Sequence, residues 1–360
     1  MNLFKNKVFI ISGIVIFSLL IIIFTLGMFK DSSMRVWAMN DLISFILVFS
    51  AINLFFIAFI NIGKPTKEFY LFKTIWLQEM IVILGVFGAV LGLLFMFSAI
   101  VNNPNLDAAS RLGGSLAVSI ITIVYALLGA FSFFLLEKYI ELNKNTSISP
   151  NIQSPQEGFK YTSIVNLLVF MGIIIFCYFL VSMIPDVNIT ILFYNDLIFI
   201  VVLILILILF YKGDSFFNLL KSLFWYNTDS EKNIRYNIIY IQNMKKIFGV
   251  CFSITLVIVP ILLWGGMTVS PDSSATTVEK YGSNVLPFVS IRNTLYYSHW
   301  SCIFIVLLSL MEGSQANKLY LQIGETITFD RYYALKFLLA PIFLLYLYIG
   351  FSTILAFVVI

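Results

Sequence analysis

The sequence predicts an all-α, polytopic integral membrane protein with about nine transmembrane helices, and three observations support this fold class. Hydrophobic residues make up 60% of the chain and charged residues 11%, whereas soluble domains contain roughly 25% charged residues. Apolar residues gather in runs of about 20, the length with which a helix crosses the hydrocarbon core of a bilayer. No stretch between these runs is long enough for a soluble domain of ordinary size.

Each apolar run is interpreted as one membrane span, because hydropathy over a window of this length identifies transmembrane helices. The predicted spans are 8–29, 40–62, 80–101, 116–138, 162–184, 195–212, 247–269, 286–311 and 337–359.

The charges of the connecting loops predict how the chain is oriented. With a cytoplasmic N-terminus, 17 Lys and Arg residues lie on the inner side. The outer side then carries only four, namely Lys30, Arg35, Arg111 and Lys280. Cytoplasmic loops of membrane proteins carry an excess of basic residues. We therefore expect a multi-pass protein of the bacterial cytoplasmic (inner) membrane with its N-terminus in the cytoplasm.

The chain repeats itself in the same order in both halves. Asn40-Asp41-Leu42-Ile43 recurs as Asn195-Asp196-Leu197-Ile198, at an offset of 155 residues. Trp76–Met80 corresponds to Tyr240–Met244 at an offset of 164, and Val118-Ser119-Ile120 recurs at an offset of 171. Because the offset grows only at loops, the pattern is typical of a tandem duplication. It predicts two parallel four-helix repeats, both starting on the inner side, plus a C-terminal helix.

This repeat divides the chain into four parts. Residues 1–142 form the first four-helix membrane unit and 161–315 a second, diverged unit. Between them, 143–160 is a polar, proline-containing stretch that predicts a flexible cytoplasmic linker. Residues 316–360 comprise a cytoplasmic segment and the terminal transmembrane helix. Within the second unit, 216–226 alternates apolar and basic residues, which predicts an amphipathic helix lying on the membrane surface.

The third predicted span contains Gly85, Gly88 and Gly92. Gly88 and Gly92 are four residues apart and therefore share one face of a helix, with Gly85 on an adjacent face. Small residues in such a strip let another helix backbone approach closely inside a membrane. We therefore expect these glycines to be helix-packing positions.

The fourth predicted span contains Ser119, Thr122 and Tyr125, which lie three residues apart and share one side of the helix. Polar side chains inside a membrane face protein or a water-filled path rather than lipid. The stripe therefore predicts a surface that faces an ion path or a partner helix.

The hairpin formed by these two spans resembles the last two transmembrane helices of the MotA/TolQ/ExbB family of proton-channel motor and stator subunits, over residues 82–137. Leu84–Leu93 is similar to the family pattern L-G-x-x-G-T-V-x-G, and Thr122–Ala130 is similar to T-T-L-Y-G-L-L-L-A. Two positions depart from the pattern, because Ala89 stands where the family has Thr and Val82 where MotA has Pro. The large cytoplasmic domain that precedes this hairpin in MotA and ExbB is also missing.

The resemblance implies that residues 1–142 form a MotA-like unit and that the chain is a subunit of an ion-driven (proton or sodium) channel or stator-like complex. Such a complex energises an envelope process. In the family, the ion-binding Asp comes from a single-span partner, MotB- or ExbD-like, that passes through a ring of these subunits. The resemblance thus implies a homo- or hetero-oligomer in which Ser119 and Thr122 face the partner helix, while Gly88 and Gly92 allow its approach.

A second polar group lies in the predicted eighth span. Arg292 at mid-helix costs at least ~2.5 kcal/mol unless it is paired or hydrated. Arg292, Tyr296 and His299 share one face, and Asn293 falls where Thr122 falls in the first unit. Two interpretations stay open. Either Arg292 reaches the nearby surface with its long side chain, or the group lines an ion path or holds a partner helix.

The sequence offers little for catalysis. It contains no phosphate-binding loop, no H-E-x-x-H and no Cys/His cluster with metal spacing. We therefore expect no enzyme activity, no metal and no cofactor, and membrane lipid rather than nucleic acid as surroundings. Glu79, Glu137 and Glu312 stand at the inner ends of spans, where interfacial placement is expected. The alternatives to the channel interpretation are a secondary transporter or lipid or anion permease built from parallel repeats, and a purely structural membrane subunit.

Overall fold

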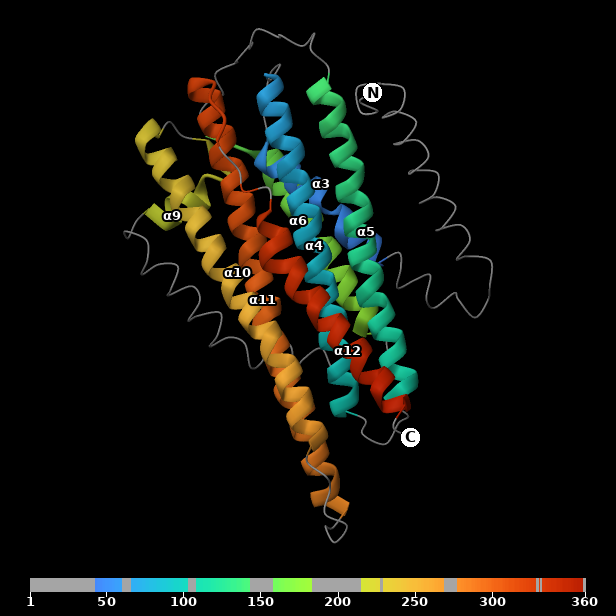
Figure 1. Cartoon of the computed structure of the whole chain (residues 1–360). Helices are drawn as coiled ribbons and strands as arrows, with labels where there is room; N and C mark the ends of the chain where they lie inside the picture. The colour runs from blue at the N-terminus through green and yellow to red at the C-terminus, as the bar shows by residue number, and fades with distance from the viewer. Residues whose placement is uncertain are drawn as a thin grey trace, which may run out of the picture.

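The structure is a computed structural model. It describes residues 43–59, 66–102, 108–142, 158–182, 215–226, 229–268, 277–327, 330 and 332–358. This part of the chain is almost entirely helical (Figure 1). Five of its helices are long and apolar enough to cross a membrane, and two shorter apolar helices accompany them. The all-α, membrane-protein class is thereby confirmed, whereas the predicted spans 8–29 and 195–212 lie outside the described residues.

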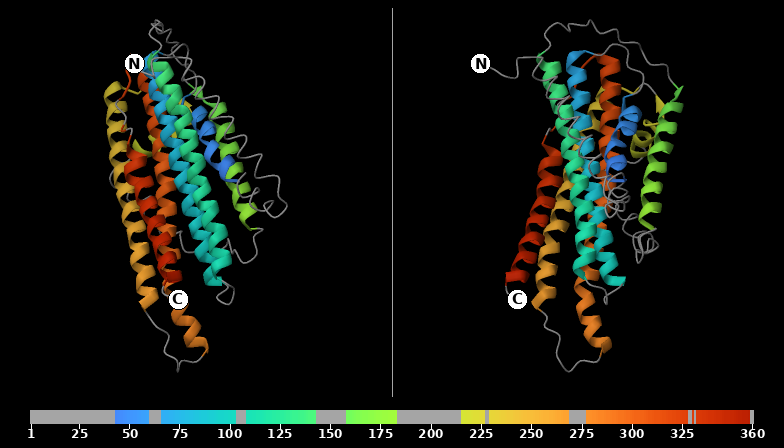
Figure 2. Two further views of the ribbon diagram at one scale, coloured as in Figure 1. Left: turned by 45° about the vertical axis from the view of Figure 1, so that its right-hand side comes forward. Right: turned by 90° about the vertical axis from the view of Figure 1, so that its right-hand side faces the viewer.

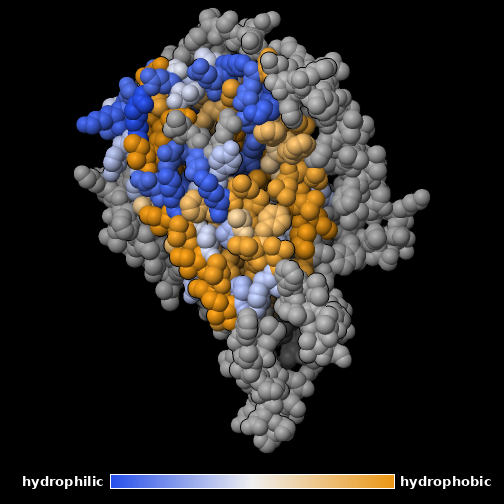
Figure 3. Space-filling model, in the orientation of Figure 1, coloured by the Kyte–Doolittle hydropathy of each residue, from blue (hydrophilic) through white to orange (hydrophobic). Residues whose placement is uncertain are grey.

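Two long helical hairpins form the centre of the molecule. α4 (Lys67–Asn102) packs along α5 (Ala108–Leu142), and α10 (Glu231–Thr268) packs along α11 (Thr277–Ile323). α4 also packs against α11, so the hairpins lie side by side (Figures 1 and 2). α4 and α10 begin, and α5 and α11 end, at the same end of the bundle. Hydrophilic side chains gather there, in the upper part of Figure 3, and we call it the polar end.

The central helices extend well beyond the predicted spans. α4, α10 and α11 contain 36, 38 and 47 residues. At 1.5 Å per residue they are about 54, 57 and 70 Å long, roughly twice the thickness of the hydrocarbon core. Charged residues end the apolar runs, but a helix continues wherever its polar residues find partners in a bundle. The predicted loop that precedes span 247–269 is therefore largely helical, because α10 already begins at Glu231.

Shorter helices flank the hairpins on both sides. Residues 43–49 are helical and lead, after a turn at Ser50, into α3 (Ala51–Ala58). α3 packs against α6 (Tyr161–Ser182), which lies at one side of the bundle (Figure 2). Beyond the second hairpin, a π-helical turn η3 (Leu335–Leu339) leads into α12 (Ala340–Val358), which packs on α10.

The segment 216–226 is not the surface helix that the sequence predicts. Its helix α9 (Ser215–Lys221) is short, and Leu219 and Leu223 are each only 1% exposed within the protein core. The following strand β2 (Trp225–Tyr226) pairs antiparallel with β1 (Gly158–Phe159). Leu219 and Leu223 are therefore covered by protein. β1 belongs to the predicted linker 143–160, whose residues 143–157 lie outside the described part.

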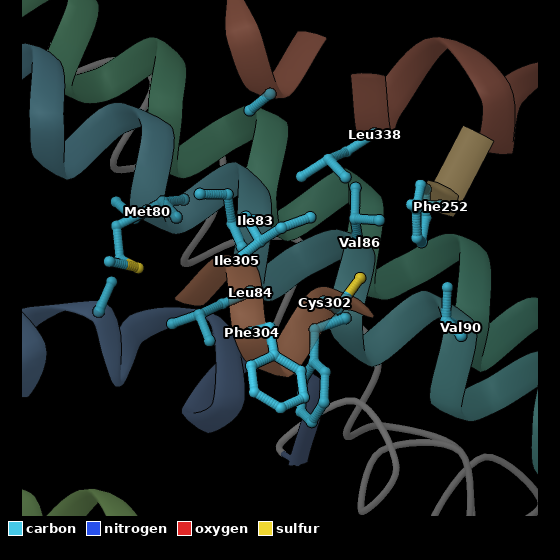
Figure 4. Close-up of a cluster of buried hydrophobic side chains, with 14 of the residues drawn as sticks. Met80, Ile83, Leu84, Val86, Val90, Phe252, Cys302, Phe304, Ile305 and Leu338 are labelled. Carbon is cyan, nitrogen blue, oxygen red and sulfur yellow. The ribbon is translucent and has the colours of Figure 1, made fainter. Parts of the chain in front are cut away.

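The hydrophobic core lies where α4, α10 and α11 meet. Figure 4 shows Met80 and Val86 of α4 gathered with Phe252 of α10 and Ile305 of α11. Of the apolar window of α4, 94% is buried inside the bundle, against 11% for α6. α4 is therefore the central helix of the described fold, and α6 presents most of its side chains to the surroundings.

Candidate functional site

The glycines of α4 face α5, the other helix of the same hairpin. A Cβ atom at Gly85 would lie 2.1 Å from the Cβ of Ala126, and one at Gly88 would lie 2.6 Å from the Cγ2 of Thr122. A Cβ atom at Gly92 would lie 2.9 Å from the Cβ of Ser119, also on α5. Real Cβ atoms do not approach other atoms closer than 3.0 Å, so only glycine fits at these positions. The close approach is thus made within the hairpin itself, by α5.

Ser119 joins three helices through its hydroxyl group. The side chain is fully buried, and Oγ donates a hydrogen bond of 2.6 Å to the carbonyl oxygen of Ala89 on α4. It also hydrogen-bonds to the hydroxyl of Tyr346 on α12. A buried hydroxyl without a partner would be costly, so these contacts explain how the fold accommodates a serine at this position.

Thr122 and Tyr125 face the helical stretch 43–49. Thr122 Oγ1 lies 2.8 Å from Ser44 Oγ in a buried hydrogen bond. The ring of Tyr125 stands edge-on to that of Phe45, with centroids 5.7 Å apart. The whole polar stripe of α5 therefore faces protein, and its partners come from the same chain.

A small cavity of about 60 Å³ lies beside this stripe. Its walls include Gly88, Thr122 and Ser44, together with Ile174 and Tyr178 of α6. One water needs at least ~10–15 Å³ of such space and two or more polar partners. The cavity therefore has room for a few waters, with hydroxyl groups in otherwise apolar walls.

A larger cavity of about 330 Å³ lies between α4, α6 and α11. Its walls are mainly apolar, with Phe87 and Ile174 among them, and they include His299 and Trp300 of α11. Ile174 and Tyr178 line both cavities, so the two spaces adjoin at one face of α6. The structure thus brings Thr122 and His299, from the two predicted polar groups, to neighbouring cavities.

His299 is almost completely buried between α4 and α6. Its ring stacks on Phe87 with centroids 5.0 Å apart, and Nε2 lies 3.1 Å from the hydroxyl oxygen of Tyr178. Nδ1 is buried and has no hydrogen-bond partner among the described residues. The imidazole therefore has one nitrogen bonded to α6 and one that is buried without a hydrogen bond to the described residues.

The other predicted residues of α11 do not line these cavities. Arg292 is 8% exposed and Tyr296 3%, so both are buried against protein. Arg292 forms no ion pair within the described part of the chain, where Arg292 Nε and Asn293 Oδ1 are buried without hydrogen-bond partners. Arg292 and His299 are seven residues apart, about 10 Å along the helix. They share a buried face but not one site.

A buried charge cluster joins α4, α10 and α11, and we call it the triad: Glu79, Lys245 and Glu312. Lys245 Nζ lies 3.1 Å from Glu79 Oε1 and 2.7 Å from Glu312 Oε2, and each side chain is at most 4% exposed. Gln242 Nε2 donates a 2.9 Å hydrogen bond to Glu312 Oε1. The ring of Tyr333 lies 4.8 Å from the ammonium group. The triad connects the first hairpin to the second.

The hydroxyl of Tyr333 donates a 2.5 Å hydrogen bond to the backbone carbonyl of Lys245. Burial raises the pKa of this hydroxyl. The phenol therefore stays protonated, and it attaches the chain before η3 to the triad.

Glu79, Glu137 and Glu312, which the sequence places at the inner ends of predicted spans, are all buried in protein. Glu137 Oε2 accepts a 3.0 Å hydrogen bond from Gln78 Nε2. The helices continue past the apolar runs, so the ends of the runs lie inside a protein bundle. The repeat carried one signal that these charges belong together. Glu79 lies in the block Trp76–Met80, and Lys245 directly follows the corresponding block Tyr240–Met244.

Comparisons of the chain with protein-family models, with curated proteins and with solved structures found no match. The chemistry of the site therefore rests on its own residues. Within the described residues, no group of three or more His, Cys, Asp or Glu side chains is placed to hold a metal ion. The cavities offer hydroxyls and one imidazole, which suit a water chain, a small cation or the polar end of an apolar molecule.

Proposed function

We propose that this chain is a membrane-embedded subunit of an ion-driven (proton or sodium) channel or stator-like complex that energises a process in the bacterial envelope. The observation that carries the proposal is the hydroxyl-bearing cavity at Ser44, Thr122 and Tyr178 within an otherwise apolar bundle. Hydroxyl groups replace part of the water shell of a small cation, or hold the waters that relay a proton. The resemblance of residues 82–137 to the MotA/TolQ/ExbB family supports the same role.

The proposal includes a partner, because no carboxylate is among the residues that line the two cavities. The ion-binding charge then comes from a single-span membrane protein with an intramembrane Asp, of the MotB or ExbD kind. We place this Asp near Tyr178, the polar side chain that borders both cavities. Ser119 is already bonded to α4 and α12, so Thr122 is the hydroxyl of the stripe assigned to the ion path.

We also propose that the chain arose by tandem duplication of a four-helix unit, with both units starting in the cytoplasm. A matching contact in the two hairpins supports this. Gln78 on α4 donates to Glu137 on α5 at 3.0 Å, and Gln242 on α10 donates to Glu312 on α11 at 2.9 Å. The two glutamines occupy the same position of the repeated block, 164 residues apart. Both hairpins also run in the same direction.

Co-purification in mild detergent from the native membrane tests the proposal first. We expect a single-span protein with an Asp in its helix, at a defined ratio to this chain. Ion flux of that complex in liposomes then tests the site. Thr122→Val should abolish flux while folded protein is retained. Ser132→Ala is the control, because Ser132 is also on α5 but donates to the carbonyl of Leu128 and lines neither cavity. Normal flux in Thr122→Val would refute the site and favour a purely structural subunit.

The larger cavity favours a second candidate function, a transporter or lipid permease. Its volume of about 330 Å³ and its mainly apolar walls fit part of an acyl chain, with Tyr178 and His299 facing the polar end. Under this alternative the chain purifies alone and retains lipid. Ile303→Trp, which fills the cavity, should then displace the lipid in native mass spectrometry, whereas Val257→Trp on the exposed face of α10 should not.

A further inference from the structure

We infer that the triad of Glu79, Lys245 and Glu312 is a proton-binding site of this chain, with the proton on the carboxyl group of Glu79. The triad shares no residue with the two cavities described above. It is therefore a separate site, and it needs no partner protein to supply a carboxylate.

The first argument is the charge balance of the triad. Two carboxylates and one ammonium carry a net charge of −1 when all three are ionised. Each of the three side chains is at most 4% exposed, so water cannot compensate that charge. A buried ion pair is tolerated, but an additional uncompensated charge is strongly disfavoured. One of the two carboxyl groups therefore holds a proton, which makes the triad neutral.

The hydrogen bonds decide which carboxyl group holds it. Both oxygens of Glu312 accept from donors, Oε2 from Lys245 at 2.7 Å and Oε1 from Gln242 at 2.9 Å. From the described residues Glu79 accepts one hydrogen bond, in which Oε1 lies 3.1 Å from Lys245 Nζ. Glu79 Oε2 is buried and has no hydrogen-bond partner within the described residues. Because donors stabilise the ionised form, Glu312 is the carboxylate and Glu79 the neutral acid.

Among the described residues, the surrounding groups provide no second cation for the triad. The chain before η3 contributes the neutral hydroxyl of Tyr333 and the negative charge of Asp330, which acts on Glu79 electrostatically. On α5, Glu137 faces Gln78 and Lys138, and Lys138 already pairs with Glu137 and Glu141. The charges that face Glu79 from these elements therefore favour a neutral carboxyl group.

Proton release would act on the contact between the two hairpins. When the Glu79 carboxyl gives its proton to water, the triad changes from neutral to a charge of −1. Glu79 on α4 and Glu312 on α11 then repel each other across a single ammonium group. The site therefore couples proton binding to the packing of α4 against α10 and α11.

Infrared spectroscopy of the purified full-length protein tests the inference. A buried neutral carboxyl group gives a carbonyl stretching band that a carboxylate lacks. We expect this band in the wild-type protein at neutral pH and its loss in Glu79→Gln. Glu137→Gln, which changes the other buried glutamate of the first hairpin, should retain the band. A band that Glu79→Gln leaves unchanged, or no band at all, would overturn the inference.

Thermal unfolding locates the proton within the triad. Glutamine resembles a neutral acid, so Glu79→Gln should unfold at the wild-type temperature, whereas Glu312→Gln removes the ionised partner of Lys245 and should unfold at a lower one. The reverse order would place the proton on Glu312 and overturn the assignment. Neither measurement involves ion flux. The proton site and the proposed channel function can therefore fail independently of each other.

Discussion

The two helical hairpins are held together in different ways, although their positions correspond in the sequence. Gly88 and Gly92 of α4 correspond to Phe252 and Leu256 of α10, 164 residues later. The two glycines bring the backbones of α4 and α5 together, whereas Phe252 and Leu256 are 0% and 1% exposed and fill the space beside α10 with side chains. Two positions that carry glycine in the first hairpin thus carry large buried side chains in the second.

The third corresponding position carries glycine in both hairpins, but the two glycines face different helices. Gly85 faces Ala126 within its own hairpin, but a Cβ at Gly249 would lie 2.8 Å from the Cβ of Phe337 in η3. The second hairpin therefore uses its glycine to receive the C-terminal helix instead of its own partner helix. Both hairpins retain a hydroxyl contact, through Ser119 in the first and through Thr255 Oγ1 and Ser298 Oγ, 2.6 Å apart, in the second. A glycine at this position can therefore admit a different neighbouring helix in each hairpin.

Lys245→Met should have the largest effect, because it breaks the contact between the hairpins. It leaves Glu79 and Glu312 buried without a cation, and removing one partner of a buried ion pair costs about 3–5 kcal/mol. Thermal unfolding in detergent measures the loss. Lys246→Met, at the exposed neighbouring position, is the matched control and should unfold like the wild type. An unchanged midpoint in Lys245→Met would show that the triad does not hold the hairpins together.

Leu256→Ala tests whether the second hairpin depends on volume. Leu256 is 1% exposed, and truncating a buried leucine leaves a cavity that costs about 2–5 kcal/mol. Val257→Ala, at a position that is 56% exposed, should lower the unfolding midpoint far less. Equal effects of the two substitutions would contradict the packing described for α10.

Gly85→Ala tests the opposite property in the first hairpin. The added methyl group would lie 2.1 Å from Ala126 Cβ, so the two helices must separate, and such overpacking costs about 1–3 kcal/mol. Gly172→Ala on α6 is the control, because nothing lies within 4 Å of a Cβ there. The control gains helix propensity and should be as stable as the wild type or slightly more stable. A stable Gly85→Ala protein would show that α4 and α5 are not fixed by backbone contact.

The smallest effect should come from Lys160, which attaches the start of α6 to α9 by donating a 3.0 Å hydrogen bond to the carbonyl of Ser222. Burial, and then the charge of Lys318, lower the pKa of Lys160 from 10.5 to about 8. Between these values the unfolded chain binds more protons than the folded one. The free energy of unfolding should therefore rise as the pH increases from about 8 towards 10.5.

Comparing unfolding midpoints at about pH 7 and pH 9.5 measures the Lys160 effect. Lys160→Met should reduce the rise with pH, because it removes the group that titrates differently in the two states. Lys232→Met, on the exposed surface of α10, should leave the rise unchanged. The same pH dependence in all three proteins would contradict the assignment.

Local spacing predicted the parts of the site that depend on one helix. The apolar runs predicted membrane-length helices, and the intervals among Gly88, Gly92, Ser119 and Thr122 placed them on faces that approach other helices closely. Spacing within a helix does not identify the helix on the other side. The sequence analysis assigned these faces to a partner helix, and in the structure Gly88 instead lies against Thr122 of the same hairpin. The ion path itself stays a prediction.

The triad could not be predicted in this way. Lys245 lies 166 residues from Glu79 and 67 from Glu312, and each residue stands just beyond an apolar run. Charged residues at such positions usually mark the membrane surface. Here they are buried because α4, α10 and α11 continue together past the apolar runs. That continuation depends on three helices at once, so no single segment of the sequence reveals it.

The packing of α4 against α11 makes the covalent link between the two halves only one of several connections. Besides the triad, Trp76 Nε1 donates a 2.9 Å hydrogen bond to the carbonyl of Ser309, and the rings of Phe69 and Tyr320 stack with centroids 3.9 Å apart. All of these contacts run from the first half to the second. Two polypeptides divided within 143–157 should therefore reassemble when they are produced together. An organism could then encode this protein as two genes without losing the fold.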